Sequence, residues 1–215
     1  MRALVVALLA LFLVSGAAPQ GGPIPGMIRV RLVTSAGPIV VALDAKRAPK
    51  TTANFLAYVD DGRLDGTLFY RSARRKGDPK FGFVQGGIGT DARRMLDPLP
   101  LESTDRTGIK HLDGAISMAH GPNADAANGN FSIMVGANPS LDARGSFRGF
   151  AAFGRVVSGM DTVKRILALP TGGGREAMKD QMILQPVHIL RAERLDGVAK
   201  PTGRVKPWLI GPPRP

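Results

Sequence analysis

The side chains that most often carry enzymatic chemistry are few and widely spaced in this 215-residue sequence. It contains no cysteine, which excludes a thiolate nucleophile, a disulfide framework and a cysteine-based metal site. The three histidines, His111, His120 and His188, lack the spacing of metal ligands, and no metalloprotease, serine-hydrolase or P-loop motif occurs. We therefore expect a protein that works without a metal and without a cofactor.

Positive charge is the most prominent chemical feature of the chain. Its formal net charge is +12, which favours acidic partners such as nucleic acid, anionic lipid or other polyanions, although the basic residues are scattered. The densest group is Arg71, Arg74, Arg75 and Lys76, which by itself indicates only a solvated face. The glycine-rich segment 85–89 does not open a helix after a parallel strand, so it does not predict a phosphate site.

Six short segments of the sequence are informative when their order and spacing are taken together. They are Ala48–Phe55, Gly66–Arg71, Phe83–Gly87, Ile116–Ala119, Leu141–Asp142 and Phe153–Asp161. Together they resemble the cyclophilins over about residues 28–195. The resemblance implies an eight-stranded antiparallel barrel capped by two helices, with a surface groove that binds X-Pro peptides and catalyses their cis/trans isomerisation.

Isomerisation of an X-Pro bond needs neither a nucleophile nor a metal. The barrier, roughly 18–20 kcal/mol, comes from amide resonance. As the bond twists, the lone pair localises on the prolyl nitrogen. A guanidinium that donates a hydrogen bond to this nitrogen therefore stabilises the twisted state more than either planar state. The resemblance places that guanidinium at Arg71, directly after Phe69 and Tyr70.

The resemblance also implies which residues contact the bound peptide. Gln85 would hold the substrate backbone or Arg71 itself, and Phe83 would form part of the groove wall. The full set of expected substrate-binding residues is Phe83, Gln85, Ala119, Asn130, Ser132, Leu141 and Phe150.

The expected proline pocket departs from the family pattern at three positions. Ser132 stands where an aromatic ring normally packs on the proline, Gly82 where a phenylalanine is common, and Ser140 where a large residue often precedes Leu-Asp. Phe81 or Phe83 could compensate for Gly82. Losing ring contacts of this size costs on the order of 1–3 kcal/mol of binding. We therefore expect weak turnover, a changed substrate preference or poor binding of cyclosporin-like inhibitors.

Hydrophobic periodicity predicts the elements that would position these residues. Apolar residues alternate over 28–32 and 39–43 around a turn, which predicts a hairpin. Apolar stripes predict helices over 49–59, where Thr52, Phe55, Leu56 and Val59 share one face and a proline lies in the first turn, and over 160–167. Further strands are predicted at 67–70, 83–85, 115–119, 131–135, 151–157 and 187–195. The pattern indicates a mainly β protein, a closed antiparallel barrel with helices at its ends, which matches the barrel that the resemblance implies.

The N-terminus has the pattern of an export signal. Arg2 precedes an apolar stretch over 3–14 and small residues at 15–18, which predicts a cleaved signal peptide over residues 1–18. The apolar stretch is too short to span a bilayer, and no later segment is apolar enough, so no transmembrane segment is expected in the mature chain. The expected organisation continues with a linker at 19–26, the barrel domain at 27–196 and a basic, proline-rich extended tail at 197–215. The expected location is periplasmic or secreted.

Three functions remain open at this point. The leading hypothesis is a monomeric prolyl isomerase whose partners are unfolded or partly folded exported proteins with X-Pro bonds, and no specific nucleic acid. The alternative is a non-catalytic proline-peptide-binding or chaperone-like module, motivated by Ser132, Gly82 and Ser140. The third is an envelope-associated protein whose basic surface and tail bind polyanions.

Overall fold

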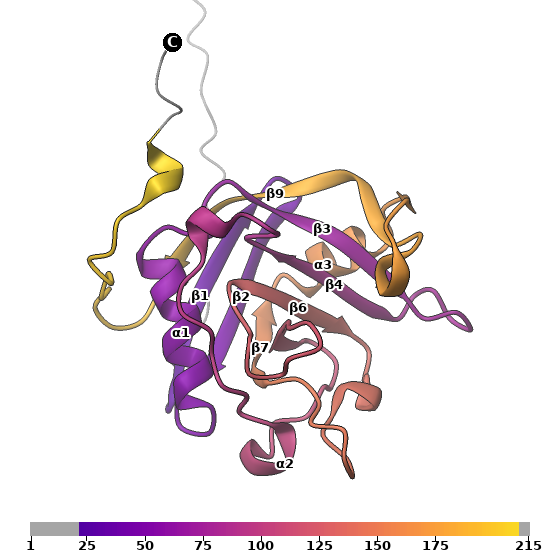
Figure 1. Cartoon of the computed structure of the whole chain (residues 1–215), viewed down its shortest axis with the longest axis horizontal. Coiled ribbons are helices and arrows are strands. Elements are labelled where there is room, and N and C mark those ends of the chain that lie inside the picture. Colours follow the sequence, from indigo (N-terminus) through magenta and orange to yellow (C-terminus); the bar gives the residue numbers. More distant parts are fainter. Residues whose placement is uncertain (1–21, 211–215) are drawn as a thin grey trace, which may run out of the picture.

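The protein, described by a computed structural model over residues 22–210, consists of short strands and few helices. The strands are β1 (Met27–Thr34), β2 (Gly37–Asp44), β3 (Thr67–Arg74), β4 (Gly82–Gly87), β5 (Ala115–Met118), β6 (Asn130–Val135), β7 (Ala152–Ser158), β8 (Thr171–Gly172) and β9 (Met182–Arg194). The α-helices are α1 (Pro49–Asp60), α2 (Thr104–Thr107) and α3 (Met160–Leu167), as Figure 1 shows. The predicted signal peptide lies outside the described residues, as does the start of the linker. No helix within 22–210 is long and apolar enough to cross a membrane.

Eight of the strands described over 22–210 close on themselves into a barrel. β1 pairs with β2 on one side and with β9 on the other, and the order between them is β2-β7-β5-β6-β4-β3-β9. All of these ladders are antiparallel. The predicted closed eight-stranded antiparallel barrel is therefore confirmed. The two-residue β8, which pairs with the start of β9, and the four-residue α2 were not predicted.

One apolar core fills the barrel and extends under both longer helices. Phe131 of β6 packs against Phe55 of α1 and Phe69 of β3, with ring centroids 5.4 and 5.7 Å apart. Val163 and Ile166 of α3 belong to the same buried cluster. The predicted apolar stripes of α1 and α3 are thus the faces that cover the barrel core, because burying them removes apolar surface from water.

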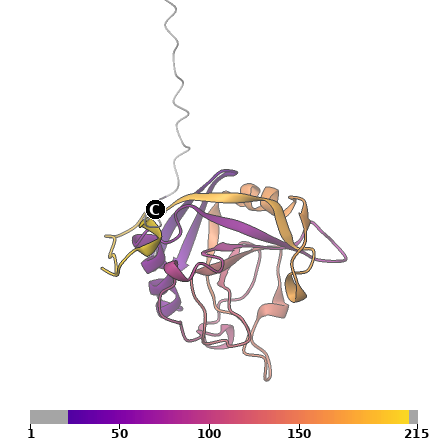
Figure 2. The ribbon, with the colours of Figure 1, turned by 45° about the horizontal axis from the view of Figure 1, so that its top comes forward.

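The C-terminal tail lies against the barrel. Thr202 donates two hydrogen bonds to the carboxylate of Asp61, from its N–H at 2.7 Å and from its hydroxyl at 2.6 Å. The N–H of Lys200 donates to Asp60 at 2.9 Å. In Figure 2, as in Figure 1, the yellow tail runs beside α1. The sequence predicts only an extended tail, whereas residues 197–210 form a docked segment, here called the C-terminal strap.

Trp208 fixes the far end of the C-terminal strap. Two guanidinium groups contact its ring, with Cζ of Arg63 and Cζ of Arg94 4.7 and 5.3 Å from the ring centroid. Arg63 also forms an ion pair with Asp61 at 2.8 Å, and both side chains are almost fully buried. The strap therefore contributes hydrogen bonds and an aromatic ring that help to satisfy a buried ion pair, as buried charges require.

Candidate active site

Arg71 lies where β3 is held between two neighbouring strands. It pairs with Gln85 of β4 on one side and with Met182 of β9 on the other. The register of both ladders shifts between Phe69 and Arg71, which leaves Tyr70 without a partner in either ladder. Such a β-bulge bends the strand and re-aims the side chains next to it. The bulge thus explains how two successive residues, Tyr70 and Arg71, can both contact Gln85.

Three hydrogen bonds fix the guanidinium of Arg71. Its Nη1 donates to Oε1 of Gln85 at 2.9 Å, and its Nε donates to Oε1 of Gln181 at 2.9 Å. Its Nη2 donates to the carbonyl oxygen of Ala177 at 2.8 Å. The ring of Phe83 lies alongside, with its centroid 5.1 Å from Cζ. Burial lowers the pKa of Arg71, but a guanidinium keeps its proton at neutral pH, so Arg71 is a fixed and charged donor.

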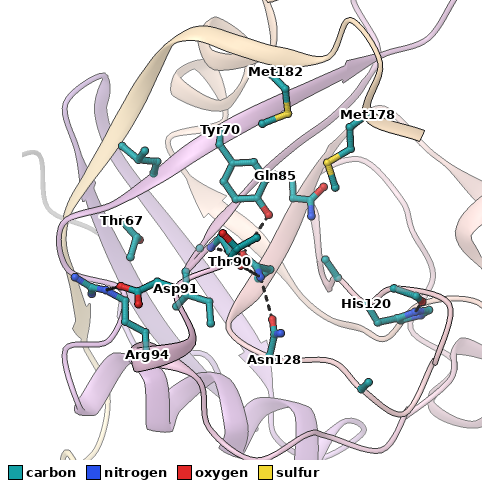
Figure 3. Close-up of a pocket in the computed structure, with 18 of the residues that line it drawn as sticks. Thr67, Tyr70, Gln85, Thr90, Asp91, Arg94, His120, Asn128, Met178 and Met182 are labelled. Carbon is teal, nitrogen blue, oxygen red and sulfur yellow. Dashed lines mark hydrogen bonds and ion pairs between the residues drawn. The ribbon is translucent and has the colours of Figure 1, made fainter. Parts of the chain in front are cut away.

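A cleft of about 590 Å³ lies beside this arginine. Gln85, Ala119 and Asn130, three of the predicted binding residues, line it, and so do Met178 and Met182 (Figure 3). Arg71 itself is not part of the lining, but it is bonded to Gln85, which is. The combination of apolar walls with a few fixed polar groups is typical of a ligand site.

A chain of hydrogen bonds begins at Tyr70 in the cleft. The Tyr70 hydroxyl donates to Oδ1 of Asn130 at 3.1 Å, and Nδ2 of Asn130 donates to Oδ1 of Asn128 and to the Gly89 carbonyl, both at 2.9 Å (Figure 3). Burial raises the pKa of Tyr70 to about 12, so the hydroxyl keeps its proton at neutral pH. The orientation of the Asn130 amide is therefore set within the protein, and its predicted contact with substrate stays a prediction.

Four of the predicted binding residues lie outside this cleft. Phe83 packs on Arg71, and Ser132 is buried on β6, with 8% of its surface exposed. Leu141 and Phe150 lie together on the connection between β6 and β7, where the Phe150 N–H donates to the Leu141 carbonyl at 3.0 Å. The structure therefore separates the predicted set into a cleft group and a group around it.

Phe150 belongs to an aromatic cluster at the rim of the cleft. Its ring stacks on His120 with centroids 4.2 Å apart, and Phe147 meets it at 6.4 Å with the rings at 64°. His120 lines the cleft, and its Nε2 lies 3.0 Å from the carbonyl oxygen of Gly149. Phe150 is thus one side chain removed from the cleft.

The expected replacement for the missing pocket ring at Gly82 is only partly available. Gly82 has a φ of +146°, and a Cβ there would lie 2.1 Å from the Ala73 carbonyl oxygen, so no side chain fits this backbone. The ring of Phe81 contacts Arg75 instead of Arg71, with Cζ of Arg75 5.4 Å from the ring centroid. Of the two phenylalanines considered for compensation, Phe83 is the one that contacts the arginine.

The structure also brings a serine, a histidine and an aspartate into one network. His111 Nε2 lies 2.9 Å from Oγ of Ser117, and Nδ1 lies 2.7 Å from Oδ1 of Asp142. The order is that of a hydrolase triad, but Ser117 is only 2% exposed on a strand flanked by β6 and β7, so substrate has no access to it. Burial lowers the pKa of His111 more than Asp142 raises it. The network holds the segment that carries Leu141 and is structural.

Sequence reasoning missed several residues that the structure places at the site. They are Tyr70, His120, Asn128, Met178, Gln181 and Met182. Tyr70 carried a usable signal, because it directly precedes Arg71 in the motif. The contacts of Gln181 and Met178 depend on the loop between β8 and β9, and no motif or periodicity in the sequence encodes the path of that loop.

The barrel is also the part of the chain that matches known proteins. The family model "Cyclophilin type peptidyl-prolyl cis-trans isomerase/CLD" matches residues 29–194. The peptidyl-prolyl cis-trans isomerase A of Dickeya dadantii is 33% identical over 165 residues, which covers 75% of this chain and 84% of the relative. A peptidyl-prolyl cis-trans isomerase of Streptomyces antibioticus is 34% identical over 172 residues, covering 79% and 99%.

Solved structures share the fold. A crystal structure of a cyclophilin-type peptidyl-prolyl cis-trans isomerase from Cryptosporidium parvum has a TM-score of 0.60 at 21% identity, and the match covers 80% of this chain and 99% of that one. A further crystal structure of the Cryptosporidium protein was obtained in the presence of the dipeptide Ala-Pro. The closed barrel, the ordered motifs and the family match over residues 29–194 show that this chain belongs to the cyclophilin-type peptidyl-prolyl cis-trans isomerases.

Proposed function

We propose that Arg71 accelerates isomerisation of a bound X-Pro bond by donating a hydrogen bond to the prolyl nitrogen of the twisted amide. The observation that supports this most directly is the guanidinium fixed beside the cleft. Its three internal contacts use one N–H on each nitrogen, so one N–H on Nη1 and one on Nη2 are left for substrate. A donor already in position needs no reorganisation when the twisted state forms.

The charge of Arg71 is kept available for the reaction. All three of its hydrogen-bond partners are neutral amide or carbonyl oxygens, so they orient the guanidinium without cancelling its charge. Burial against Phe83 reduces screening by water and strengthens any hydrogen bond to the substrate. Since the prolyl nitrogen becomes a good acceptor only when the bond twists, this interaction stabilises the transition state selectively.

A coupled cis/trans assay on Xaa-Pro peptides tests the role of Arg71. Removing a donor that stabilises a transition state typically costs about 100- to 1000-fold, so Arg71→Ala should lower kcat/KM by about two orders of magnitude. Arg75→Ala is the matched control, because Arg75 is an exposed arginine nearby whose guanidinium donates to the Ala137 carbonyl. Its rate should stay within about twofold of wild type. The proposal is refuted if Arg71→Ala is as fast as wild type, whether or not both match the uncatalysed reaction.

We also propose that the substrates are exported proteins and that the mature chain acts as a monomer in the periplasm or outside the cell. The support is the signal-peptide pattern over residues 1–18. Cell fractionation and N-terminal sequencing of the full-length chain should find a product that begins near residue 18 or 19 outside the cytoplasm. A chain that stays inside the cell with its N-terminus intact would contradict this.

A non-catalytic peptide-binding module is the second candidate, and the remodelled pocket supports it. Ser132 offers no ring to a bound proline, and the backbone at Gly82 accepts no side chain. NMR titration with an Ala-Pro-containing peptide separates the two functions. Shifts at Gln85 and Ala119 without exchange between cis and trans peptide favour the binding module, whereas exchange cross-peaks between the isomers favour catalysis.

A further inference from the structure

The loop between β8 and β9 supplies two of the three oxygen atoms that hold Arg71. They are the carbonyl oxygen of Ala177, at 2.8 Å, and Oε1 of Gln181, at 2.9 Å. The third oxygen belongs to Gln85, which lies within one of the ordered motifs. Gln181 lies outside all six of those segments. The arginine is thus held between a glutamine from β4 and a second glutamine from the opposite side.

Two hydrogen bonds fix the backbone of Gln181. Its carbonyl oxygen accepts a hydrogen bond from the N–H of Ser72 on β3 at 2.9 Å, and its own N–H donates to the Met178 carbonyl at 3.0 Å. Ser72 directly follows Arg71, so the backbone of Gln181 is tied to the strand that carries the arginine. Only the side-chain torsions of Gln181 therefore separate this anchored backbone from the Oε1 atom that accepts the hydrogen bond from Arg71 Nε.

The loop itself has an unusual and specific backbone. Glu176 and Asp180 have φ angles of 49° and 61°, in the left-handed region that residues other than glycine rarely adopt. Gly174 has a φ of +78°, and a Cβ there would lie 2.2 Å from the Met178 carbonyl oxygen. Strained residues persist where the surroundings fix them, and they concentrate at functional sites. The strain is a second observation, independent of the hydrogen bonds, that marks this loop.

We propose that Gln181 is a positioning residue. By accepting a hydrogen bond from Nε of Arg71, it orients the guanidinium so that the remaining N–H groups on Nη1 and Nη2 point at the prolyl nitrogen. This inference rests on the proposed role of Arg71. A guanidinium is planar and rigid, so contacts at all three nitrogens define both its place and its plane. Without the Gln181 oxygen, the two remaining contacts leave the Nε edge free to tilt, and the donors then meet the twisted bond less often.

Kinetics of three variants test the proposal. Gln181→Ala should lower kcat about tenfold, the effect of one lost hydrogen bond to a charged group, while KM stays within about twofold because the cleft lining is unchanged. Gln181→Glu keeps an acceptor oxygen at the same reach, but its carboxylate offsets part of the Arg71 charge, so it should restore only part of kcat, to about threefold below wild type. Gln185→Ala is the matched control, an exposed glutamine on β9 that should leave both constants unchanged.

A readout other than activity decides whether the contact itself exists. Solvent exchange of the Arg71 Nε–H proton, followed by ¹⁵N NMR, should become about tenfold faster in Gln181→Ala and stay unchanged in Gln185→Ala. Wild-type kcat with unchanged exchange in Gln181→Ala would overturn the proposal. So would equal losses in kcat, KM and melting temperature that Gln181→Glu does not rescue, since that result means a purely structural role. If wild type is inactive, the proposed function fails, and the exchange measurement still decides whether Gln181 holds Arg71.

Discussion

Replacing Trp208 by alanine should release the C-terminal strap. The ring lies 4.7 and 5.3 Å from the guanidinium carbons of Arg63 and Arg94, and each such contact contributes about 0.5–1 kcal/mol at a partly exposed site. Burial of part of the ring contributes about 1 kcal/mol more. We expect the free energy of unfolding to fall by about 2–3 kcal/mol. For a domain of this size, the melting temperature should then fall by about 5–10 °C.

Thermal unfolding followed by far-UV circular dichroism measures this effect. The control is Leu209→Ala, since Leu209 lies in the same turn, is 71% exposed and should cost less than about 0.5 kcal/mol. Amide hydrogen exchange at Thr202, whose N–H donates to Asp61, should accelerate in Trp208→Ala only. Equal melting temperatures for wild type and Trp208→Ala, or equal losses in both variants, would show that the stacked ring does not hold the strap.

Three further outcomes follow from the site. Stability should fall as the pH drops below about 6.5, by up to about 1.4 kcal/mol per pH unit, because burial lowers the pKa of His111 and only the unfolded state then takes up the proton. Urea unfolding at pH 7.5 and 5.5 measures this, and equal stability at both values would contradict it. Tyr70→Phe should cost about 1 kcal/mol of stability, since Asn130 loses a donor. Because burial raises the pKa of Tyr70 to about 12, wild-type activity should show no inflection near pH 9. An inflection there that Tyr70→Phe removes would contradict this. Ser132→Phe should tighten binding of a proline peptide about tenfold in calorimetric titration by adding apolar contact, and unchanged affinity would count against the missing-ring interpretation.

Local patterns were sufficient to predict the barrel and its two longer helices, α1 and α3. The alternation over 28–32 and 39–43 corresponds to β1 and β2, whose register pairs Thr34 with Gly37 across the turn. In α1, the predicted stripe residues Phe55, Leu56 and Val59 are all buried. These predictions succeed because burial of one face imposes a period of 2 on a strand and about 3.6 on a helix.

The C-terminal strap and the rest of the site depend on contacts between segments that share no period. The docking of Thr202 and Trp208 rests on single hydrogen bonds and ring contacts with residues far away in the chain, which leave no trace in hydropathy. The loop that carries Gln181 uses left-handed Glu176 and Asp180, where a sequence would lead one to expect glycine. The resemblance identified Arg71 and Gln85, but it could not show which other groups fix the arginine.

The pairing of β1 with β9 constrains how the chain can fold. Partners such as Val30 and Arg194 lie near opposite ends of the domain, so the barrel cannot close before almost all of it has been synthesised. Contacts between residues so distant in sequence slow folding, because a long loop must be ordered before they form. A nascent chain that ends before β9 therefore leaves one edge of β1 and one edge of β3 unpaired, and unpaired edges of this kind can pair with other chains.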